Sequence, residues 1–477
     1  MKKRLLTYLT VLLAVIIAVS ACMTAFAEES EESDMKGVKA DNWNALFDRS
    51  GERNTWLCAD GIYSVSLDGK DSISSATKDS KTFFIFSDSF IGNAASNGSM
   101  SLASMVNHSA MVLTGNEPLD KNAEFIWGLK GDTKQRNNIF GIDEWMFDLL
   151  SDGENLYLFG FTHDSNWKPE RIDLYTVPIV DGDVDLSAYT RKLNISPLIK
   201  KTENAHYVFS MGITPNTETA GAKNPDGYYY FYGYRDNIGN WIQTKDLIVS
   251  RIHENDFPDF SKLTYWNGSE WGSDIEQSAV LVENVSCEVS VTPIEYGPHA
   301  GRYIAIYTEM VQSAHMKYAL GDSPWGPFDT PVEFYTAPET GTDAIGGNGA
   351  LYTYNAKAHP HLSDGNKLLV SYNVNVSMSA ARNCRDYYPR FLYLDLGGEI
   401  PTVTTPVETE TQAPATTGAP LTDTPVTTDT PVTAPLDPVT PSDKPLTWVL
   451  PTVLSACALL GAGIGAYFFL KHKKKKH

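Results

Sequence analysis

Cysteine is scarce in this chain, which has five in 477 residues. Cys22 and Cys457 lie in apolar segments near the two ends, so only Cys58, Cys287 and Cys384 remain for the body of the protein. Three thiols cannot form a complete disulfide framework, and no Cys-x-x-Cys or zinc-type spacing is present. The fold must therefore be stabilised by a hydrophobic core, which a region of ~360 residues is long enough to supply.

Several common catalytic motifs are also missing. The sequence has no Gly-x-Ser-x-Gly elbow, no P-loop, no His-Glu-x-x-His pair and no Asp-x-Asp-x-Asp-Gly calcium loop. No cofactor is expected, although a divalent ion at the centre of the fold is compatible with the sequence. Long helical periodicity is almost absent between residues 41 and 398, and short aromatic-rich strands with Asp-Gly or Gly turns replace it. These features predict an all-β domain.

Basic residues are few outside the two ends. Between the terminal segments, 30 Lys and Arg stand against 58 Asp and Glu, a net charge of about −28. Such a charge argues against nucleic acid or anionic lipid as a ligand. It suits neutral or cationic ligands, although a solvated acidic surface explains it equally well.

The two ends of the chain predict export and anchoring. Basic residues at 2–4, an apolar run and the small residues Ala25 and Ala27 are typical of a signal peptide over residues 1–27. Cleavage before a lipidated Cys22 is the alternative. Residues 447–470 are apolar and long enough to form a single C-terminal transmembrane helix, and the basic tail 471–477 is expected in the cytoplasm. We therefore expect a single-pass protein of the bacterial cell surface with its N-terminal domain outside.

Two further segments have compositions that cannot build a core. Residues 28–40 are acidic and are predicted to be disordered. Residues 399–446 are rich in Thr and Pro, which favours extended polyproline II structure and predicts a stalk between the domain and the membrane.

A repeated hairpin pattern is the main indication of the fold. A polar residue, an apolar strand, a turn and an aromatic-rich strand recur at residues 59–90, 144–164, 206–236, 287–310 and 358–375. Hairpins repeated at this interval predict a five-bladed β-propeller over residues 41–398, with a pair of β-sandwiches as the fallback. Third strands are expected around residues 111–113, 174–177, 247–250 and 316–319. Closure is expected to pair residues 391–396 with the segment around Trp56.

The polar residues that bracket these hairpins are the candidate functional residues. The start of one antiparallel strand and the end of the next lie at the same edge, so the brackets of all hairpins converge on one face. Asp60 and Asp88 bracket the first hairpin, and Glu288 opens the fourth inside a Val-rich strand. A buried carboxyl group in such a place needs a partner or carries a proton, as a general acid does. The alternative for both aspartates is a turn residue that caps backbone N–H groups.

Six further residues are candidates for binding a substrate. Glu144 opens the second hairpin beside Trp145, and alternation places Glu144 and Asp148 on one face. The others open or close the third and fifth hairpins: His206, Arg235, His359 and Asn373. Each histidine is equally compatible with an ordinary core position.

Several motifs resemble a known family. They are Asp60–Val65, Phe86–Gly92, Asp322–Pro327, Tyr354–Pro360 and Leu369–Asn373. Together they resemble secreted bacterial five-bladed propellers of a "domain of unknown function" related to glycoside hydrolases, one branch of which includes endo-D-arabinanases. The resemblance covers residues 44–397 and implies that Asp60 and Asp88 belong to the active face and Glu288 to the acid position. The usual Gly-Asp-Thr of the first blade is Ser87-Asp88-Ser89 here, which leaves the substrate class open.

Two functions remain in competition. The first is a glycosidase that cleaves an extracellular or cell-wall polysaccharide, with Asp60 or Asp88 as base or nucleophile and Glu288 as acid. The second is a non-catalytic surface module that binds a glycan or a protein through the same face. In both cases we expect a monomer.

Overall fold

A computed structural model describes residues 35–165, 168–238, 244–340, 351–376 and 383–398 of the chain. The predicted signal peptide, stalk, transmembrane span and basic tail lie outside the described residues. No helix within the described ranges is long and apolar enough to cross a membrane. The described residues all belong to the unit that ends at Ile400.

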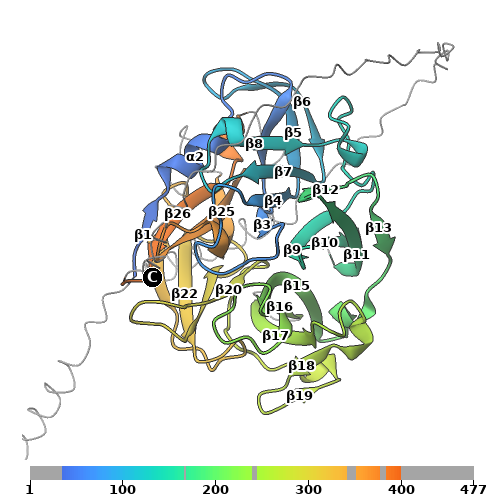
Figure 1. Cartoon of the computed structure of the whole chain (residues 1–477), viewed down its shortest axis with the longest axis vertical. Helices are drawn as coiled ribbons and strands as arrows, with labels where there is room; N and C mark the ends of the chain where they lie inside the picture. Colours follow the sequence, from blue (N-terminus) through green and yellow to red (C-terminus); the bar gives the residue numbers. More distant parts are fainter. Residues whose placement is uncertain (1–34, 166–167, 239–243, 341–350, 377–382, 399–477) are drawn as a thin grey trace, which may run out of the picture. The chain divides into compact units, whose positions relative to one another are not determined.

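Antiparallel strands dominate the structure and form, within the described residues, five sheets of four or more strands and one three-stranded sheet. In sheet 1 the order is β3-β4-β7-β8, and in sheet 2 it is β9-β10-β11 with β12 and β13 outside. Sheet 3 runs β14 to β19, sheet 4 runs β20 to β23, and sheet 5 has the order β24-β25-β26-β1. The small sheet has the order β2-β5-β6. The sheets follow one another around a common centre in chain order (Figure 1).

The strand bounds follow directly from the aromatic and β-branched runs of the sequence. Sheets 1 and 2 contain β3 Tyr63–Ser66, β4 Lys81–Phe86, β7 Ser109–Thr114, β8 Ala123–Ile126, β9 Trp145–Ser151, β10 Asn155–His163, β11 Pro169–Val180, β12 Asp183–Val184 and β13 Thr190–Lys192. Sheet 3 contains β14 Ile199–Lys201, β15 Ala205–Asn216, β16 Tyr228–Asn237, β17 Lys245–His253, β18 Thr264–Trp266 and β19 Trp271–Gly272. Sheets 4 and 5 contain β20 Ser290–Pro293, β21 Tyr303–Thr308, β22 His315–Gly321, β23 Val332–Thr336, β24 Tyr352–Ala358, β25 Lys367–Asn375, β26 Arg390–Asp395 and β1 Gly37–Lys39. The small sheet contains β2 Thr55–Ala59, β5 Ser89–Ala94 and β6 Met100–Val106.

Helical structure among the described residues is limited to short segments. One α-helix, α2 (Asp41–Phe47), packs beside β26 and buries Trp43, Leu46 and Phe47. The 3-10 helices of the described residues are η1 Asp120–Asn122, η2 Leu129–Gly131, η3 Ser196–Leu198, η4 Phe260–Lys262, η5 Ile275–Gln277, η7 Pro360–Leu362 and η8 Cys384–Asp386. The predicted all-β class is therefore confirmed, and the four predicted third strands are β7, β11, β17 and β22.

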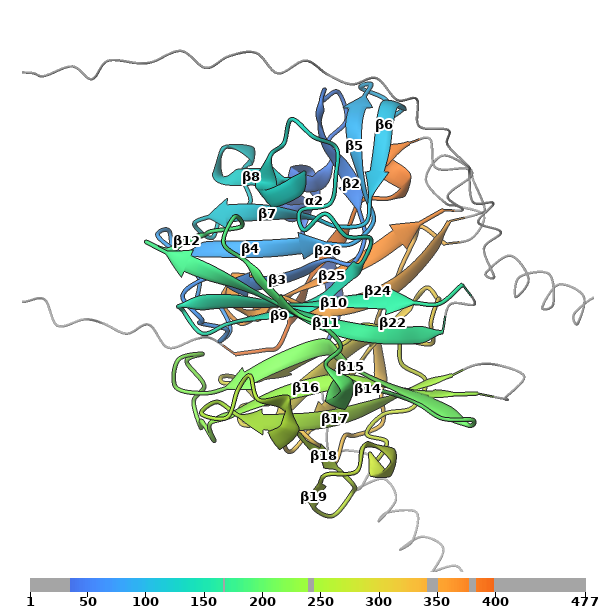
Figure 2. The same ribbon diagram turned by 90° about the vertical axis from the view of Figure 1, so that its right-hand side faces the viewer.

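Apolar clusters join each sheet to the next. Phe83 and Leu156 belong to a cluster between sheets 1 and 2, and Phe159 and Phe231 to one between sheets 2 and 3. Similar clusters lie between sheets 3 and 4, between sheets 4 and 5, and between sheet 5 and sheet 1. In the turned view, sheets 1, 2 and 3 succeed one another down the molecule (Figure 2). The core is thus divided among the junctions of the sheets, and the last junction closes the circuit.

The closure of sheet 5 differs from the prediction. Residues 391–396 do not pair with the segment around Trp56, because Trp56 lies in β2 and pairs with Ile91 of β5. Strand β26 pairs with β1 instead, with Val38 opposite Tyr393. Residues 37–39 were assigned to the disordered acidic segment, but backbone hydrogen bonds to β26 stabilise them as a strand despite their short length.

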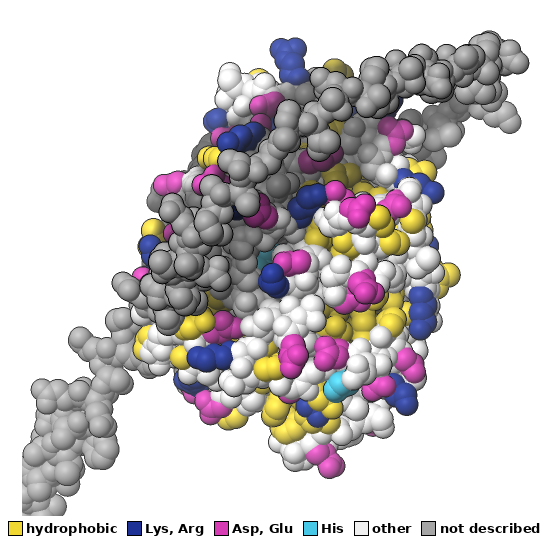
Figure 3. All heavy atoms as spheres, viewed as in Figure 1, with side chains coloured by type: hydrophobic (Ala, Val, Ile, Leu, Met, Phe, Trp, Pro, Cys, Tyr) yellow, Lys and Arg dark blue, Asp and Glu magenta, His cyan; other side chains and the backbone are white. Residues whose placement is uncertain are grey.

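Surface charge is mixed on the face shown in Figure 3. Acidic side chains are interspersed there with Lys and Arg, and no basic area extends across the described part of that face. A continuous basic surface is what binding to a polyanion requires.

Candidate functional site

The chain brings Asp60 and Asp88 together at the start of sheet 1. The Asp60 N–H donates to the Asp88 carbonyl at 3.3 Å, and the Ser87 N–H donates to the Asp60 carbonyl at 2.8 Å. Antiparallel pairing thus places the residue before β3 beside the residue after β4, as the hairpin pattern predicts. Both residues are partly exposed.

Asp60 is a carboxyl group without a cationic partner among the described residues. The Tyr354 hydroxyl donates to its carboxylate, and Asn375 donates to Tyr354 at 2.8 Å. Burial raises the pKa of Asp60 to about 7, with the negative charges of Asp88 and Glu288 adding to the rise and the Tyr354 hydrogen bond opposing it. Asp60 can therefore hold a proton near neutral pH.

Asp88 accepts two side-chain hydrogen bonds at one oxygen. Asn107 Nδ2 and Trp145 Nε1 donate to Oδ1 at 3.2 and 3.0 Å. Burial raises the pKa of Asp88 to about 6, and these two donors oppose the rise. Trp145 thus contacts a candidate catalytic group, and its ring lies 4.8 Å from that of His163.

Glu288 lies two residues before β20 and is 7% exposed. Its carboxylate forms an ion pair with Lys357, whose side chain is 2% exposed. The ammonium group also lies 4.2 Å from the centroid of the Tyr63 ring. We refer to Asp60, Asp88 and Glu288 as the carboxylate cluster; Glu288 contributes to the field at Asp60.

Lys357 is a residue that the sequence analysis missed. Tyr354 of β24 pairs with Asn373 of β25, and Lys357 pairs with Ser371. The interval is three residues on β24 and two on β25, so β24 contains one extra residue. This β-bulge contains Asn355, whose φ is +57°. Asn adopts the left-handed conformation more readily than most residues do. The Asn in the sequence Tyr-Asn-Ala-Lys was therefore the signal that could have indicated this bulge.

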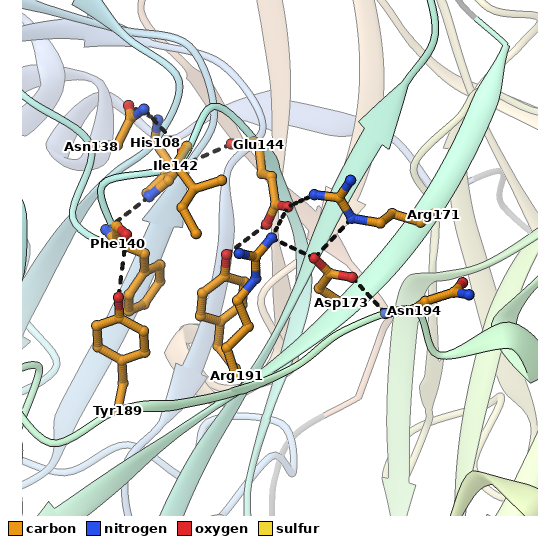
Figure 4. Close-up of polar contacts among 11 residues, drawn as sticks. His108, Asn138, Phe140, Ile142, Glu144, Arg171, Asp173, Tyr189, Arg191 and Asn194 are labelled. Atoms are coloured by element: carbon orange, nitrogen blue, oxygen red, sulfur yellow. Dashed lines mark hydrogen bonds and ion pairs between the residues drawn. The ribbon is translucent and has the colours of Figure 1, made fainter.

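Glu144 lies outside the carboxylate cluster. Its side chain points to the outer strands of sheet 2, where it contacts Arg171, Arg191 and Tyr175 at 2.7, 2.5 and 2.6 Å (Figure 4). Asp173 shares both arginines at 3.1 and 2.6 Å. We call these five residues the arginine network. Gly160 permits the contact, because a Cβ there would lie 2.4 Å from Glu144 Oε2.

A second bulge explains why Glu144 and Asp148 do not share a face as expected. The interval from Met146 to Leu149 on β9 is three residues long and pairs with an interval of two residues on β10, so β9 contains one extra residue. Asp148 is therefore turned inward, where it accepts a hydrogen bond from the Ile213 N–H at 2.6 Å. Burial raises the pKa of Asp148 to about 7. Simple alternation fails here because the bulge shifts its phase by one residue.

A small cavity lies among the first strands of the five sheets. Tyr63, Asp148, Ile213, Ser290 and Lys357 line it, one from each sheet. Its volume of about 30 Å³ has room for about two water molecules and is too small for a sugar ring. Asp60, Asp88 and Glu288 are not among the residues that line it. Among the described residues, no group of three His, Cys, Asp or Glu side chains is arranged to hold a metal ion.

His206 and Arg235 lie on sheet 3, each next to an acidic partner. His206 Nδ1 is 3.6 Å from Asp236 Oδ2, and burial lowers the pKa of this histidine. Arg235 forms an ion pair with Asp246 at 3.1 Å. The structure gives neither residue a contact with the carboxylate cluster.

His359 and Asn373 occupy different ends of the fifth hairpin. His359 does not open this hairpin as predicted, because β24 ends at Ala358 and the histidine follows it. Its two ring nitrogens lie 2.7 Å from Ser64 Oγ and Ser371 Oγ, so it joins sheets 5 and 1. Asn373 is paired opposite Tyr354 and is 1% exposed, and its amide makes no hydrogen bond to the described residues.

Comparison with known proteins identifies the family. Residues 41–395 match the family model described as a domain of unknown function, DUF5005. The chain belongs to this family. No curated protein matches it significantly.

Solved structures show what the domain is similar to. A protein from Bacteroides ovatus ATCC 8483, described as a putative hydrolase, aligns with a TM-score of 0.56 and 18% identity over 77% of this chain and 95% of that one, which shows a common fold. The GH43_1 enzyme from Xanthomonas citri aligns with a TM-score of 0.39 and 14% identity over 74% and 93% of the two chains. The GH62 α-L-arabinofuranosidase domain of Coprinopsis cinerea gives 0.35 and 10% over 72% and 97%. The match to the family model confirms the predicted resemblance to a domain of unknown function.

Proposed function

We propose that this DUF5005 domain is a glycosidase that cleaves a polysaccharide at the face carrying the carboxylate cluster. The observation that supports this most directly is the backbone pairing that holds Asp60 beside Asp88, two carboxyl groups whose pKa burial raises to about 7 and about 6. A glycosidase needs one carboxyl group that carries a proton and one that is ionised. Neighbouring carboxyl groups in unlike environments provide such a pair.

We further propose that the five large sheets are the blades of a propeller, with β3, β9, β15, β20 and β24 as inner strands. Their consecutive contacts and the five junction clusters support this arrangement. In a propeller the starts of all inner strands lie on one face, which is where the carboxylate cluster is found. The proposed location is the outside of the cell, with anchoring through residues 447–470.

The test is hydrolysis of arabinans, galactans, xylans, mannans and wall glycans by the full chain, with products identified by mass spectrometry. We expect one glycan class to be cleaved and Asp60→Asn to lower the rate by about 10²-fold or more, the usual share of an acid–base group. Asp183→Asn is the matched control, because Asp183 is exposed and pairs only with Lys81 among its described contacts. Full activity in a folded Asp60→Asn variant would contradict the assigned site.

The rival function, a non-catalytic glycan-binding module, is favoured by one observation. Glu288 is ion-paired, and a salt-bridged carboxylate is less available for chemistry than a free one. Binding of one glycan by the wild-type chain without cleavage of any in the panel would reject the glycosidase and support this module.

A further inference from the structure

We propose that Lys357 is a positioning residue that keeps Glu288 as the ionised carboxylate of the site and leaves Asp60 as the proton donor. This inference rests on the proposed glycosidase function. It reverses the roles implied by the family resemblance, in which Glu288 is the acid and Asp60 or Asp88 the base or nucleophile.

The burial of Lys357 requires a negative partner. Its side chain is 2% exposed, and an ammonium group removed from water is strongly destabilised unless it is paired. Glu288 supplies the ion pair, and the face of the Tyr63 ring at 4.2 Å adds a cation–π contact. Asp148 also lies within the field of Lys357, as does the neutral His359, whose pKa burial and this charge hold well below its usual range.

Because of the β24 bulge, Lys357 and Tyr354 contact two different carboxyl groups of the carboxylate cluster. Residues three apart on a regular strand point to opposite faces. The extra residue in the bulge changes this, so that Tyr354 hydrogen-bonds to Asp60 while Lys357 contacts Glu288. One strand therefore supplies a neutral hydroxyl to the first carboxyl group and a cation to the second.

The groups around Asp60 differ from those around Glu288 in charge. Asp88 and Glu288 are acidic, and Tyr354, which donates a hydrogen bond to Asp60, is a neutral hydroxyl group. Within the described residues no Lys or Arg forms an ion pair with Asp60. Carboxyl groups placed in such unlike surroundings separate into one that holds a proton and one that does not, which assigns the acid and the anion.

The assigned roles give a balanced reaction. The bond from the anomeric carbon to the glycosidic oxygen breaks, its electron pair goes to that oxygen, and the oxygen takes the Asp60 proton. The Glu288 carboxylate faces the positive charge that develops on the sugar. A water molecule then bonds to the anomeric carbon and gives its proton to Asp60, so that one water is consumed and the site is restored.

The first test does not need a substrate. The full chain is labelled with ¹³C at the Asp and Glu carboxyl carbons, and the signals of Asp60 and Glu288 are assigned by their loss in Asp60→Asn and Glu288→Gln. We expect Asp60 to take up its proton near pH 7. Protonation of Glu288 at a higher pH than Asp60 would overturn the proposal, whether or not any glycan is cleaved. A failed glycan screen with the expected order would reject the glycosidase alone.

The second test changes Lys357 itself. In Lys357→Met, Glu288 should take up its proton at least about one pH unit higher than in the wild type, because a nearby opposite charge is worth about 1–3 units. The rate on a glycan cleaved by the wild type should fall about 10²-fold, whereas Lys357→Arg, which keeps the charge, should stay within a few-fold. Lys317→Met, which loses an ion pair with Glu309 in sheet 4, is the matched control. An unchanged Glu288 titration in folded Lys357→Met would contradict the proposal.

Discussion

Two groups of charged residues in this domain are built differently. The arginine network balances the carboxylates of Glu144 and Asp173, both with fully buried side chains, against two guanidinium groups and the Tyr175 hydroxyl (Figure 4). The carboxylate cluster has three acidic groups and one ammonium group, from Lys357. Both groups contain carboxyl groups, so the difference between them is the number of counter-charges for each carboxyl group.

The two groups also differ in the pKa shifts of their carboxyl groups. In the arginine network burial raises the pKa of Glu144, whereas hydrogen bonds from the Asn194 backbone and from the arginines outweigh burial and lower the pKa of Asp173. Asp60 and Asp88 have no guanidinium partner among the described residues, and burial raises the pKa of both. A balanced network fixes the geometry of a sheet, whereas an unbalanced one keeps a proton available near neutral pH at a cost in stability.

Removing one arginine from the arginine network should give the largest change in the free energy of unfolding. Arg191→Met leaves two buried carboxylates with Arg171 alone, and we expect a loss of about 3–5 kcal/mol in the free energy of unfolding, as for other buried pairs. Chemical denaturation of the full chain measures this. Arg302→Met is the matched control, because its partners Asp322 and Asp329 are 70% and 60% exposed and such pairs contribute about 1 kcal/mol or less. Equal losses in the two variants would show that the network is no more than a surface salt bridge.

Removing a charge from the carboxylate cluster should have the opposite effect on the free energy of unfolding and should stabilise the fold at pH 8. Asp88→Asn keeps the oxygen that accepts from Asn107 and Trp145, because both donate to Oδ1. The folded pKa of about 6 lies above the unfolded value of about 3.9. The wild type is therefore most stable relative to the variant below pH 4 and loses that advantage as pH rises from 4 to 6.

At pH 8 we expect Asp88→Asn to be more stable than the wild type by about 2–3 kcal/mol, since each pKa unit corresponds to about 1.4 kcal/mol. Urea denaturation at pH 4, 5, 6 and 8 measures the difference. A difference that does not change with pH would mean that Asp88 is ionised to the same extent in the folded and unfolded chain.

The hairpin pattern was sufficient to predict much of this arrangement. Aromatic strands bracketed by polar residues placed Asp60 beside Asp88 and located the third strands, because antiparallel pairing leaves little freedom once the hairpins are known. Sheet closure was mispredicted, since the three residues of β1 carry no hydrophobic pattern and form a strand only on the edge of β26.

The hairpin pattern of the sequence could not predict the β-bulges. An inserted residue in β9 sends Glu144 outward and Asp148 inward, and one in β24 directs Lys357 to Glu288, which is 69 positions away in the chain. Alternation assumes a constant phase, whereas a bulge is stabilised by tertiary contacts that no local stretch of sequence reveals. The position of His359 was misassigned for a related reason, because the strand before it was placed several residues too late.

The smallest expected effect concerns a single hydrogen bond of the carboxylate cluster. Trp145→Phe removes the Nε1–H donor that lies 3.0 Å from Asp88 Oδ1 but leaves Asn107 in place. Since a hydrogen bond to a charged group is worth about 1.5 kcal/mol or more, the pKa of Asp88 should rise by about one unit. Carboxyl ¹³C titration measures the change. Trp56→Phe is the matched control, because its indole donates at 3.0 Å to the neutral Ser109 hydroxyl and its loss should leave Asp88 unchanged. Equal shifts in both variants would mean that a general loosening around Asp88, and not the loss of a hydrogen bond to its carboxylate, changes the pKa.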